Sequence, residues 1–93
     1  MRRTSRKRER TTLAIIALNT RAYGRHRSGA RRELAEAADR ALREASEIER
    51  QVYQAEFVEG MDSKRISETC FVSIATYYRA RARLIERVAN LVG

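Results

Sequence analysis

Residues that end helices are scarce in this sequence: there is no proline, and the four glycines stand at positions 24, 29, 60 and 93. Proline and glycine disfavour a helix interior more than any other residue, so long stretches of the chain contain nothing that would stop a helix. Those stretches are rich in alanine, arginine, glutamate and leucine, which are good helix formers. The sequence therefore predicts an all-α fold, a small helical domain whose breaks fall at the glycines.

Length and cysteine content narrow the class of protein. The chain has 93 residues, enough for one domain, and Cys70 is its only cysteine, so no disulfide within the chain supports the fold. A single thiol in a small domain is more often a core residue than a nucleophile. The apolar run at 13–18 is too short for a signal-peptide core or a membrane span. We therefore expect a cytoplasmic protein that makes no contact with a membrane.

Charge is distributed unevenly along the chain, whose formal net charge is +8. Residues 1–32 carry eleven Lys or Arg and one acid, residues 33–62 carry three and nine, and residues 63–93 carry six and two. Two basic ends thus flank an acidic middle, as expected of a protein that contacts phosphates at two places. For residues 1–10, a basic disordered tail on an ordinary domain is the alternative.

Residues 1–10 are interpreted as a basic, mobile arm. Arms of helical DNA-binding domains follow the minor groove, and we expect the same of its cations. These cations are Arg2, Arg3, Arg6, Lys7, Arg8 and Arg10. A first helix should begin with a cap at Thr11 or Thr12 and end near Arg21. Its expected apolar face consists of Leu13, Ile16 and Ala17, flanked by Ile15 and Leu18. Two glycines within six residues then predict a loop at 23–29.

A second helix is expected from Ala30 onwards. Its apolar positions are spaced alternately by four and three residues, and they are Leu34, Ala38, Ala41, Ala45, Ile48, Val52 and Ala55. The helix is either continuous for nearly thirty residues or broken at Ser46, because Ser46 and Glu49 have the spacing of a capping box. The apolar stripe either packs in the core or forms a dimer contact, so residues 11–46 are assigned to packing or dimerisation.

The acids of the middle segment have local partners in the sequence. Glu36–Arg40 and Asp39–Arg43 are pairs four residues apart with the acid first, the favourable order on a helix. We therefore interpret the acidic side chains as a mostly solvated face. Negative charge would also keep this helix away from phosphates, which places the DNA-binding surface elsewhere.

Residues 47–93 follow the order of a helix-turn-helix unit. Gly60 is expected to end the preceding helix, because a helix C-terminus favours a glycine with positive φ. Asp62 or Ser63 should cap a short helix over 64–70.

Within that short helix Ile66 and Cys70 are four residues apart and should face inward. Phe71 and Val72 are expected to form the turn, with Val72 buried. Ser73 should cap the last helix by accepting a hydrogen bond from an amide in its first turn. The last helix is long and basic.

The last helix has two faces. Its buried side is expected to contain Tyr77, Ala80, Leu84, Ile85, Val88 and Leu91. Its outer side should contain Ile74, Ala75, Tyr78, Arg79, Arg81 and Arg83. The first residues of a recognition helix reach base edges in the major groove, so Arg79 is expected to contact guanine, and Ile74 or Ala75 a thymine methyl group. Tyr78 suits bases or phosphates, and the expected phosphate contacts are Thr76, Lys64, Arg65 and Arg83. Ser73 and Arg81 are also counted among the expected DNA-binding residues.

This half of the chain resembles a known class. Residues 47–92 resemble the C-terminal helix-turn-helix of sigma-factor region 4, and the run Ser73-x-x-Thr76-Tyr77-Tyr78-Arg79-x-Arg81 is similar to the ArpU/RinA-type phage transcriptional regulators. The resemblance implies a DNA-binding activator of phage or prophage genes, acting at the nucleoid of a bacterial host cell, with RNA polymerase as a further candidate partner. Sigma-like units usually have glycine at the turn and alanine in the helix before it, where this chain has Phe71 and Ser67.

The leading hypothesis is a sequence-specific regulator of double-stranded DNA that acts as a homodimer. A small phage adaptor or DNA-packaging recognition subunit, working through protein contacts, is the alternative, as is a helical hairpin with a solvated basic face. RNA binding remains open from charge alone, although aromatic and glycine-rich platforms for single strands are missing. An enzyme is not expected, nor is a cofactor or a metal, because the sequence has one histidine, His26, and no nucleophile or metal-ligand constellation.

Overall fold

A computed structural model describes residues 2–24 and 29–92, which form helices and no strand. The helices are α1 (Arg2–Tyr23), α2 (Gly29–Glu44), α3 (Glu47–Val52), the π-helix η1 (Tyr53–Val58), α4 (Ser63–Cys70) and α5 (Ile74–Val92). The all-α prediction is therefore confirmed over these residues. Most of the predicted loop at 23–29 lies outside the described residues. His26 lies wholly outside them.

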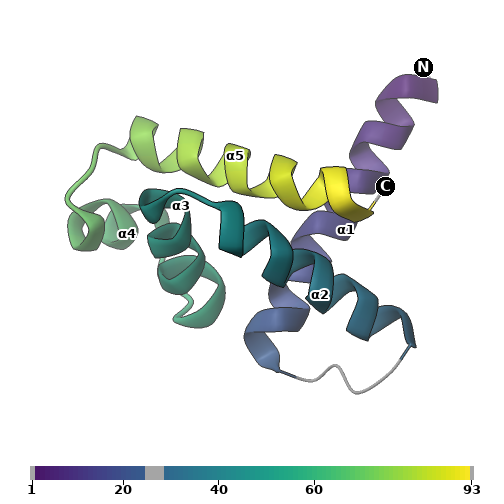
Figure 1. The fold of residues 1–93 in the computed structure, drawn as a ribbon. Coiled ribbons are helices and arrows are strands. Elements are labelled where there is room, and N and C mark those ends of the chain that lie inside the picture. Colours follow the sequence, from purple (N-terminus) through teal and green to yellow (C-terminus); the bar gives the residue numbers. More distant parts are fainter. Residues whose placement is uncertain (1, 25–28, 93) are drawn as a thin grey trace.

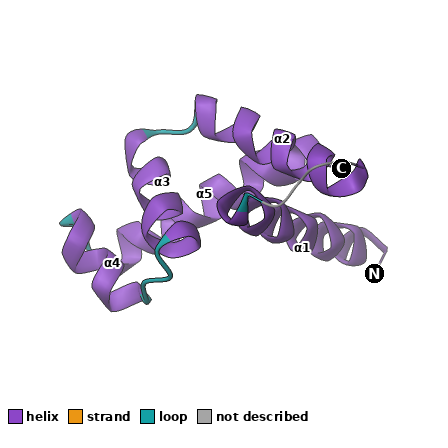
Figure 2. Ribbon diagram, turned by 90° about the horizontal axis from the view of Figure 1, so that it is seen from below, coloured by secondary structure: helices purple, strands orange, loops and turns teal. Residues whose placement is uncertain are grey.

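Helix α5 runs through the middle of the fold. Figure 1 shows α3 and α4 gathered around its first turns, and α1 and α2 around its last turns. Figure 2, seen from below, places α4 and the N-terminal end of α1 at opposite ends of the molecule. The helix that the sequence assigns to recognition is thus also the element that joins the two halves.

Helix α1 is longer than the sequence predicts. It begins at Arg2, so the expected start at Thr11 or Thr12 is wrong. The basic segment contains no proline or glycine, and Arg and Lys are good helix formers, so the helix continues through it. Figure 1 shows this N-terminal half projecting beyond the body of the fold.

The apolar face of α1 is also rotated from the predicted one. Ala14, Ala17 and Leu18 are fully buried, whereas Leu13 and Ile16 are 37% and 44% exposed. Small alanines allow α1 to approach α2 and α5 closely, and this leaves the larger side chains of Leu13 and Ile16 on the outer side.

The second predicted helix breaks at Ser46, as the capping-box alternative requires. Helix α2 ends at Glu44, and the Ser46 hydroxyl accepts a hydrogen bond from the Glu49 amide at 3.3 Å. The same hydroxyl donates to Oε2 of Glu49 at 2.9 Å. On the other side of the break, Arg50 donates to the carbonyls of Leu42 and Ala45 at 3.3 and 2.7 Å. These bonds satisfy backbone groups that the break leaves without helical partners.

The predicted apolar stripe packs in the core of the single chain. Two clusters form the core, and the stripe contributes to both. The first joins α1, α2, η1 and α5 and contains Ala14, Ala17, Leu18, Ala38, Ala41, Leu42, Ala45, Tyr53, Phe57, Leu84, Ile85 and Val88. The second lies around α4 and contains Val52, Ala55, Ile66, Tyr77 and Ala80. The core alternative for the stripe is therefore correct for this chain.

The π-helix η1 serves both clusters. A π-helix is wider than an α-helix and rare beyond a single turn. Here Tyr53 and Phe57 stack at 6.0 Å in the first cluster, while Ala55 from the same turn lies in the second. Gly60 follows with φ of 70° and ends the segment, as predicted.

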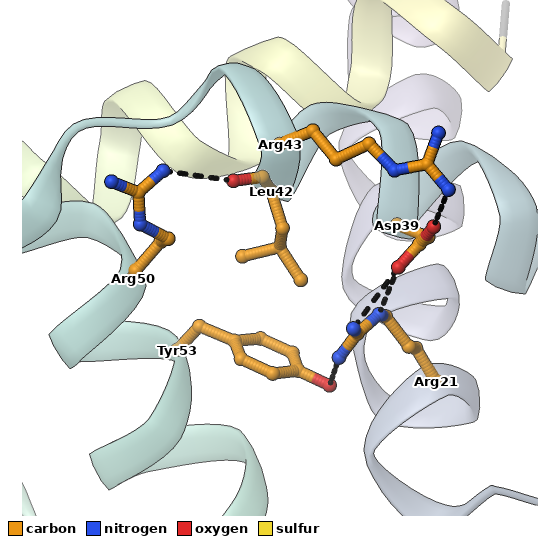
Figure 3. Close-up of polar contacts among 6 residues, drawn as sticks. All are labelled: Arg21, Asp39, Leu42, Arg43, Arg50 and Tyr53. Atoms are coloured by element: carbon orange, nitrogen blue, oxygen red, sulfur yellow. Dashed lines mark hydrogen bonds and ion pairs between the residues drawn. The ribbon is translucent and has the colours of Figure 1, made fainter.

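A polar contact fixes α1 against α2 and η1. Arg21 donates to Oδ1 of Asp39 at 3.0 Å and to the hydroxyl of Tyr53 at 3.0 Å, and its guanidinium lies 5.3 Å from the centre of the Tyr53 ring (Figure 3). Asp39 also pairs with Arg43 at 2.8 Å, as predicted. The hydrogen bond from Arg21 holds the pKa of Asp39 below its ordinary value.

The predicted pairing of Glu36 differs in the structure. Oε1 of Glu36 lies 3.8 Å from Nε of Arg32, one turn earlier in α2. This ion pair, in which the base precedes the acid, replaces the expected pair with Arg40. Both side chains are largely exposed, and such a pair contributes little to stability.

Glu49 is an exception to the interpretation of the acidic side chains as a mostly solvated face. Its side chain is 1% exposed, and its Oε1 accepts from Nε of Arg87 in α5 at 2.6 Å. Burial disfavours the charged form, but the hydrogen bonds from Arg87 and Ser46 overcome this and leave the pKa of Glu49 below its ordinary value. The carboxylate therefore ties α3 and the capping box to α5.

We expect Glu49→Gln to destabilise the domain by about 1.5–3 kcal/mol at neutral pH, since it removes a buried, charge-assisted hydrogen bond. The native pKa of Glu49 lies below its ordinary value of 4.5, so this stabilisation is present above that pH and is lost as the pH falls through the native pKa. Urea unfolding at several pH values measures it. The exposed neighbour Glu47→Gln is the control, and equal losses for the two variants would contradict the assignment.

Candidate nucleic-acid interface

Helix α4 begins as the sequence predicts. The carboxylate of Asp62 accepts from the Arg65 amide at 2.9 Å, which makes Asp62 the N-cap. Ile66 is fully buried, and Cys70 is half-buried. Burial raises the pKa of the Cys70 thiol, consistent with a packed rather than reactive side chain.

The turn between α4 and α5 centres on Phe71. Its backbone has φ of 56° and ψ of 45°, the left-handed conformation that favours glycine. The Val72 amide donates to the carbonyl of Ser67 at 3.1 Å, and the Ser67 hydroxyl donates to the carbonyl of Val72. These bonds close the turn. Val72 is half-buried rather than buried, and the Phe71 ring is 94% exposed.

Ser73 caps α5 as predicted. Its hydroxyl accepts from the Thr76 amide at 3.1 Å and donates to the Thr76 hydroxyl at 2.9 Å. The bond occupies the Thr76 side chain, which also accepts from Arg79 at 3.4 Å. The turn and the cap therefore fix where α5 starts and how its first turn is oriented.

The buried side of α5 largely follows the prediction. Tyr77, Ala80, Leu84, Ile85 and Val88 are buried. Leu91 is 39% exposed, so its predicted burial is wrong, because in the last turn of α5 Val92, the next residue, packs against the core instead.

The outer side of α5 carries the predicted reading residues. Ile74 and Tyr78 are 46% and 53% exposed, and Ala75, Arg79 and Arg83 are also exposed. Among the described residues, neither Arg79 nor Arg83 enters an ion pair. On α4, Lys64 and Arg65 are exposed too. The first three turns of α5 thus present apolar, aromatic and cationic groups together.

Arg81 differs from the prediction, because it faces inward. Its Nε donates to both carboxylate oxygens of Glu56 at 2.9 Å, and its side chain is 30% exposed. The Tyr77 hydroxyl donates to Oε1 of the same carboxylate at 2.6 Å. Burial, together with the hydrogen bond to Glu56, raises the pKa of Tyr77. Arg81 therefore positions α5 against η1 instead of lying on the outer face.

Sequence reasoning identified Glu49 in the capping box but missed the contacts of Glu49 and Glu56 with α5. Their partners are 38 and 25 residues away, a separation that leaves no periodic pattern. Of the expected arm cations, Lys7, Arg8 and Arg10 are exposed on α1. The side chains of Arg2, Arg3 and Arg6 lie outside the described part of the structure.

Other kinds of site find no support in the described residues. They contain no group of three His, Cys, Asp or Glu side chains placed to hold a metal ion. No helix among them combines the length and apolar character needed to cross a bilayer. Comparison of the chain with protein-family models, curated proteins and solved structures finds no match.

We expect Phe71→Gly to stabilise the domain by about 0.5–1 kcal/mol. The left-handed backbone is unfavourable for a residue with a Cβ, and removing an exposed ring sacrifices almost no packing. Phe71→Ala is the matched control, because it removes the ring but keeps the Cβ, and it should give no gain. Thermal unfolding of both variants measures the difference. A less stable glycine variant would mean that the ring supports the fold.

We expect Glu56→Gln to destabilise the domain by about 1.5–3 kcal/mol, because Arg81 and Tyr77 lose a shared anionic acceptor. Amide hydrogen exchange should accelerate most in the first two turns of α5, which Glu56 restrains. The exposed Glu59→Gln serves as the control for charge. Uniform acceleration over the whole domain would show that Glu56 has no specific effect on α5.

Proposed function

We propose that this protein is a sequence-specific regulator that reads double-stranded DNA with the first turns of α5. The observation that carries the proposal is the outer face of α5, where Ile74, Ala75, Tyr78 and Arg79 remain exposed on a helix whose start is fixed by a cap and a tight turn. The fold does not require any of these four side chains to be exposed. Their combination suits base edges in a major groove.

Each group has a contact that its chemistry favours. Arg79 is suited to a bidentate contact with guanine, and Ile74 or Ala75 to a thymine methyl group. Thr76, Lys64, Arg65 and Arg83 suit phosphates that flank the groove. Arg81 holds α5 in place through Glu56, so we assign it a positioning role instead of a DNA contact.

The biological setting is proposed from the resemblance to ArpU/RinA-type regulators. It suggests an activator of phage or prophage genes at the host nucleoid, with RNA polymerase as a candidate partner. A homodimer follows from the same proposal, because regulators of this kind read two half-sites. The stripe from Leu34 to Ala55 is occupied by the core of the single chain, so it does not supply the dimer contact.

A protein-binding adaptor remains the second candidate, and one observation favours it. Leu13, Ile16 and Tyr23 lie exposed along α1, and Leu91 is exposed at the end of α5. Exposed apolar groups of this kind are common at protein interfaces. Helix α1 and the C-terminal end of α5 lie away from the α4–α5 turn (Figure 1), so DNA reading and protein binding are separable by mutation.

The two functions predict opposite results for two variants. Arg79→Ala should lower affinity for the selected DNA site by about 1–3 kcal/mol and relax the preference at one base pair. Arg40→Ala, an exposed arginine on α2, is the control and should have no such effect. If Arg79→Ala leaves regulation intact while Ile16→Glu abolishes it, the adaptor is correct and the DNA-reading proposal is wrong.

Selection of bound duplexes from a random pool at about 150 mM salt supplies the site for that measurement, and a recurring motif is the expected result. A palindrome would support the homodimer, because half-site symmetry mirrors that of the protein. Binding that is salt-sensitive but without base preference would leave only attraction to phosphates.

A further inference from the structure

A groove lies between the N-terminal half of α1 and the flank of α5 beside its outer side. It is open and has a volume of about 580 Å³. Its walls are Lys7, Arg10 and Thr11 from α1, and Tyr78, Arg81, Ala82, Ile85, Glu86, Ala89 and Asn90 from α5. Figure 1 shows that α1 crosses α5 near the C-terminal end of α5, and that the N-terminal half of α1 projects outward from there.

The charges of the groove are predominantly positive. Lys7 and Arg10 are exposed and enter no ion pair among the described residues. Arg81 is neutralised by Glu56, and Glu86 is the single acid among the described lining residues. Two available cations therefore face one carboxylate, which favours an anionic occupant.

The groove is continuous with the face of α5 that we propose reads bases, because Tyr78 belongs to both. From Ala75 to Ile85 the helix rises by about 15 Å, at about 1.5 Å per residue. The DNA major groove is about 12 Å wide. With Ala75 at the bases, the part of α5 from Ile85 onwards, which lines the same groove as Lys7 and Arg10, thus reaches a sugar-phosphate wall of the DNA major groove.

We propose that Lys7 and Arg10 of α1 contact the DNA phosphates bordering the major groove that α5 enters. This inference rests on the proposed function, and it assigns the α1–α5 groove as a second DNA-binding site. It also replaces the minor-groove arm. A helix with its side chains is about 10 Å wide, whereas the minor groove is about 6 Å wide, so a helical α1 presents its cations from outside.

A DNA backbone suits the groove better than an acidic partner helix does. The small side chains of Ala82 and Ala89 leave room for a sugar-phosphate strand, and the cations stand at one edge only. A docked helix would need apolar contacts along both walls, but the α1 wall is Lys7, Arg10 and Thr11. The test must therefore distinguish DNA binding at this groove from protein binding.

The test measures how DNA affinity depends on salt for full-length variants. Lys7→Gln/Arg10→Gln should lower affinity at low salt and reduce the slope of log K against log salt by about 1–2, because each phosphate contact contributes about 0.9. Arg31→Gln/Arg40→Gln removes two exposed α2 cations that enter no ion pair among the described residues, and it is the matched control. Circular dichroism of each variant verifies that the fold is retained.

Glu86→Gln supplies a test in the opposite direction. Removing the acid of the groove should tighten DNA binding at low salt, whereas Glu33→Gln, an exposed acid on α2, should have a smaller effect. A merely structural role for the groove would not predict tighter binding. Phosphate ethylation interference should also show contacts beside the recognised bases that vanish in Lys7→Gln/Arg10→Gln.

The outcomes separate the two proposals. If the Lys7/Arg10 pair and its control change the slope equally, the α1 contact is wrong even when α5 reads its site. If the wild type binds DNA without base preference but the slope still falls only for Lys7→Gln/Arg10→Gln, the α1 contact stands and sequence reading fails. A wild type that binds no DNA overturns both, and this would direct attention to a protein occupant.

Discussion

The fold depends on carboxylates from the acidic middle of the chain that hold arginines of α5. Glu49 accepts hydrogen bonds from Arg87 and Glu56 accepts them from Arg81, so α3 and η1 are tied to α5 at two levels. A buried charge is unfavourable unless it is paired and hydrogen-bonded, and Glu49 meets that condition through Arg87 and Ser46. The capping box that breaks the chain at Ser46 is thus part of the same network that orients α5.

The ties are needed because the core is small and rich in alanine. Each alanine buries little surface, but it lets helices approach closely, and the two clusters meet only through α5 and the segment that continues α3 into η1. The wider π-helical turn lets that segment supply Tyr53 and Phe57 to one cluster and Ala55 to the other. A helix-turn-helix unit held this way has a defined orientation relative to α1 and α2.

The sequence predicted the features that depend on local chemistry. The break at Ser46, the caps at Asp62 and Ser73, and the end at Gly60 all follow from side chains or backbone within three or four residues. The position of the turn was also predicted, although Phe71 occupies it in place of glycine. The features that were missed depend on distant partners: the inward face of Arg81, the burial of Glu49, the rotation of α1 and the π-helix. No local spacing encodes them.

The net charge of a sequence segment is therefore a poor guide to which surface can bind a polyanion. Helix α5 has four arginines, but Arg81 and Arg87 are bound by acids, which leaves Arg79 and Arg83 for an external anion. Two acids of the middle segment therefore act on α5 itself: they pair with Arg81 and Arg87 and leave Arg79 and Arg83 without an ion pair among the described residues. Lys7 and Arg10 of α1 enter no ion pair among the described residues, so their positive charge is retained beside the groove. The proposed DNA-binding surface on α5 and α1 is therefore indicated by cations without acidic partners and not by net charge.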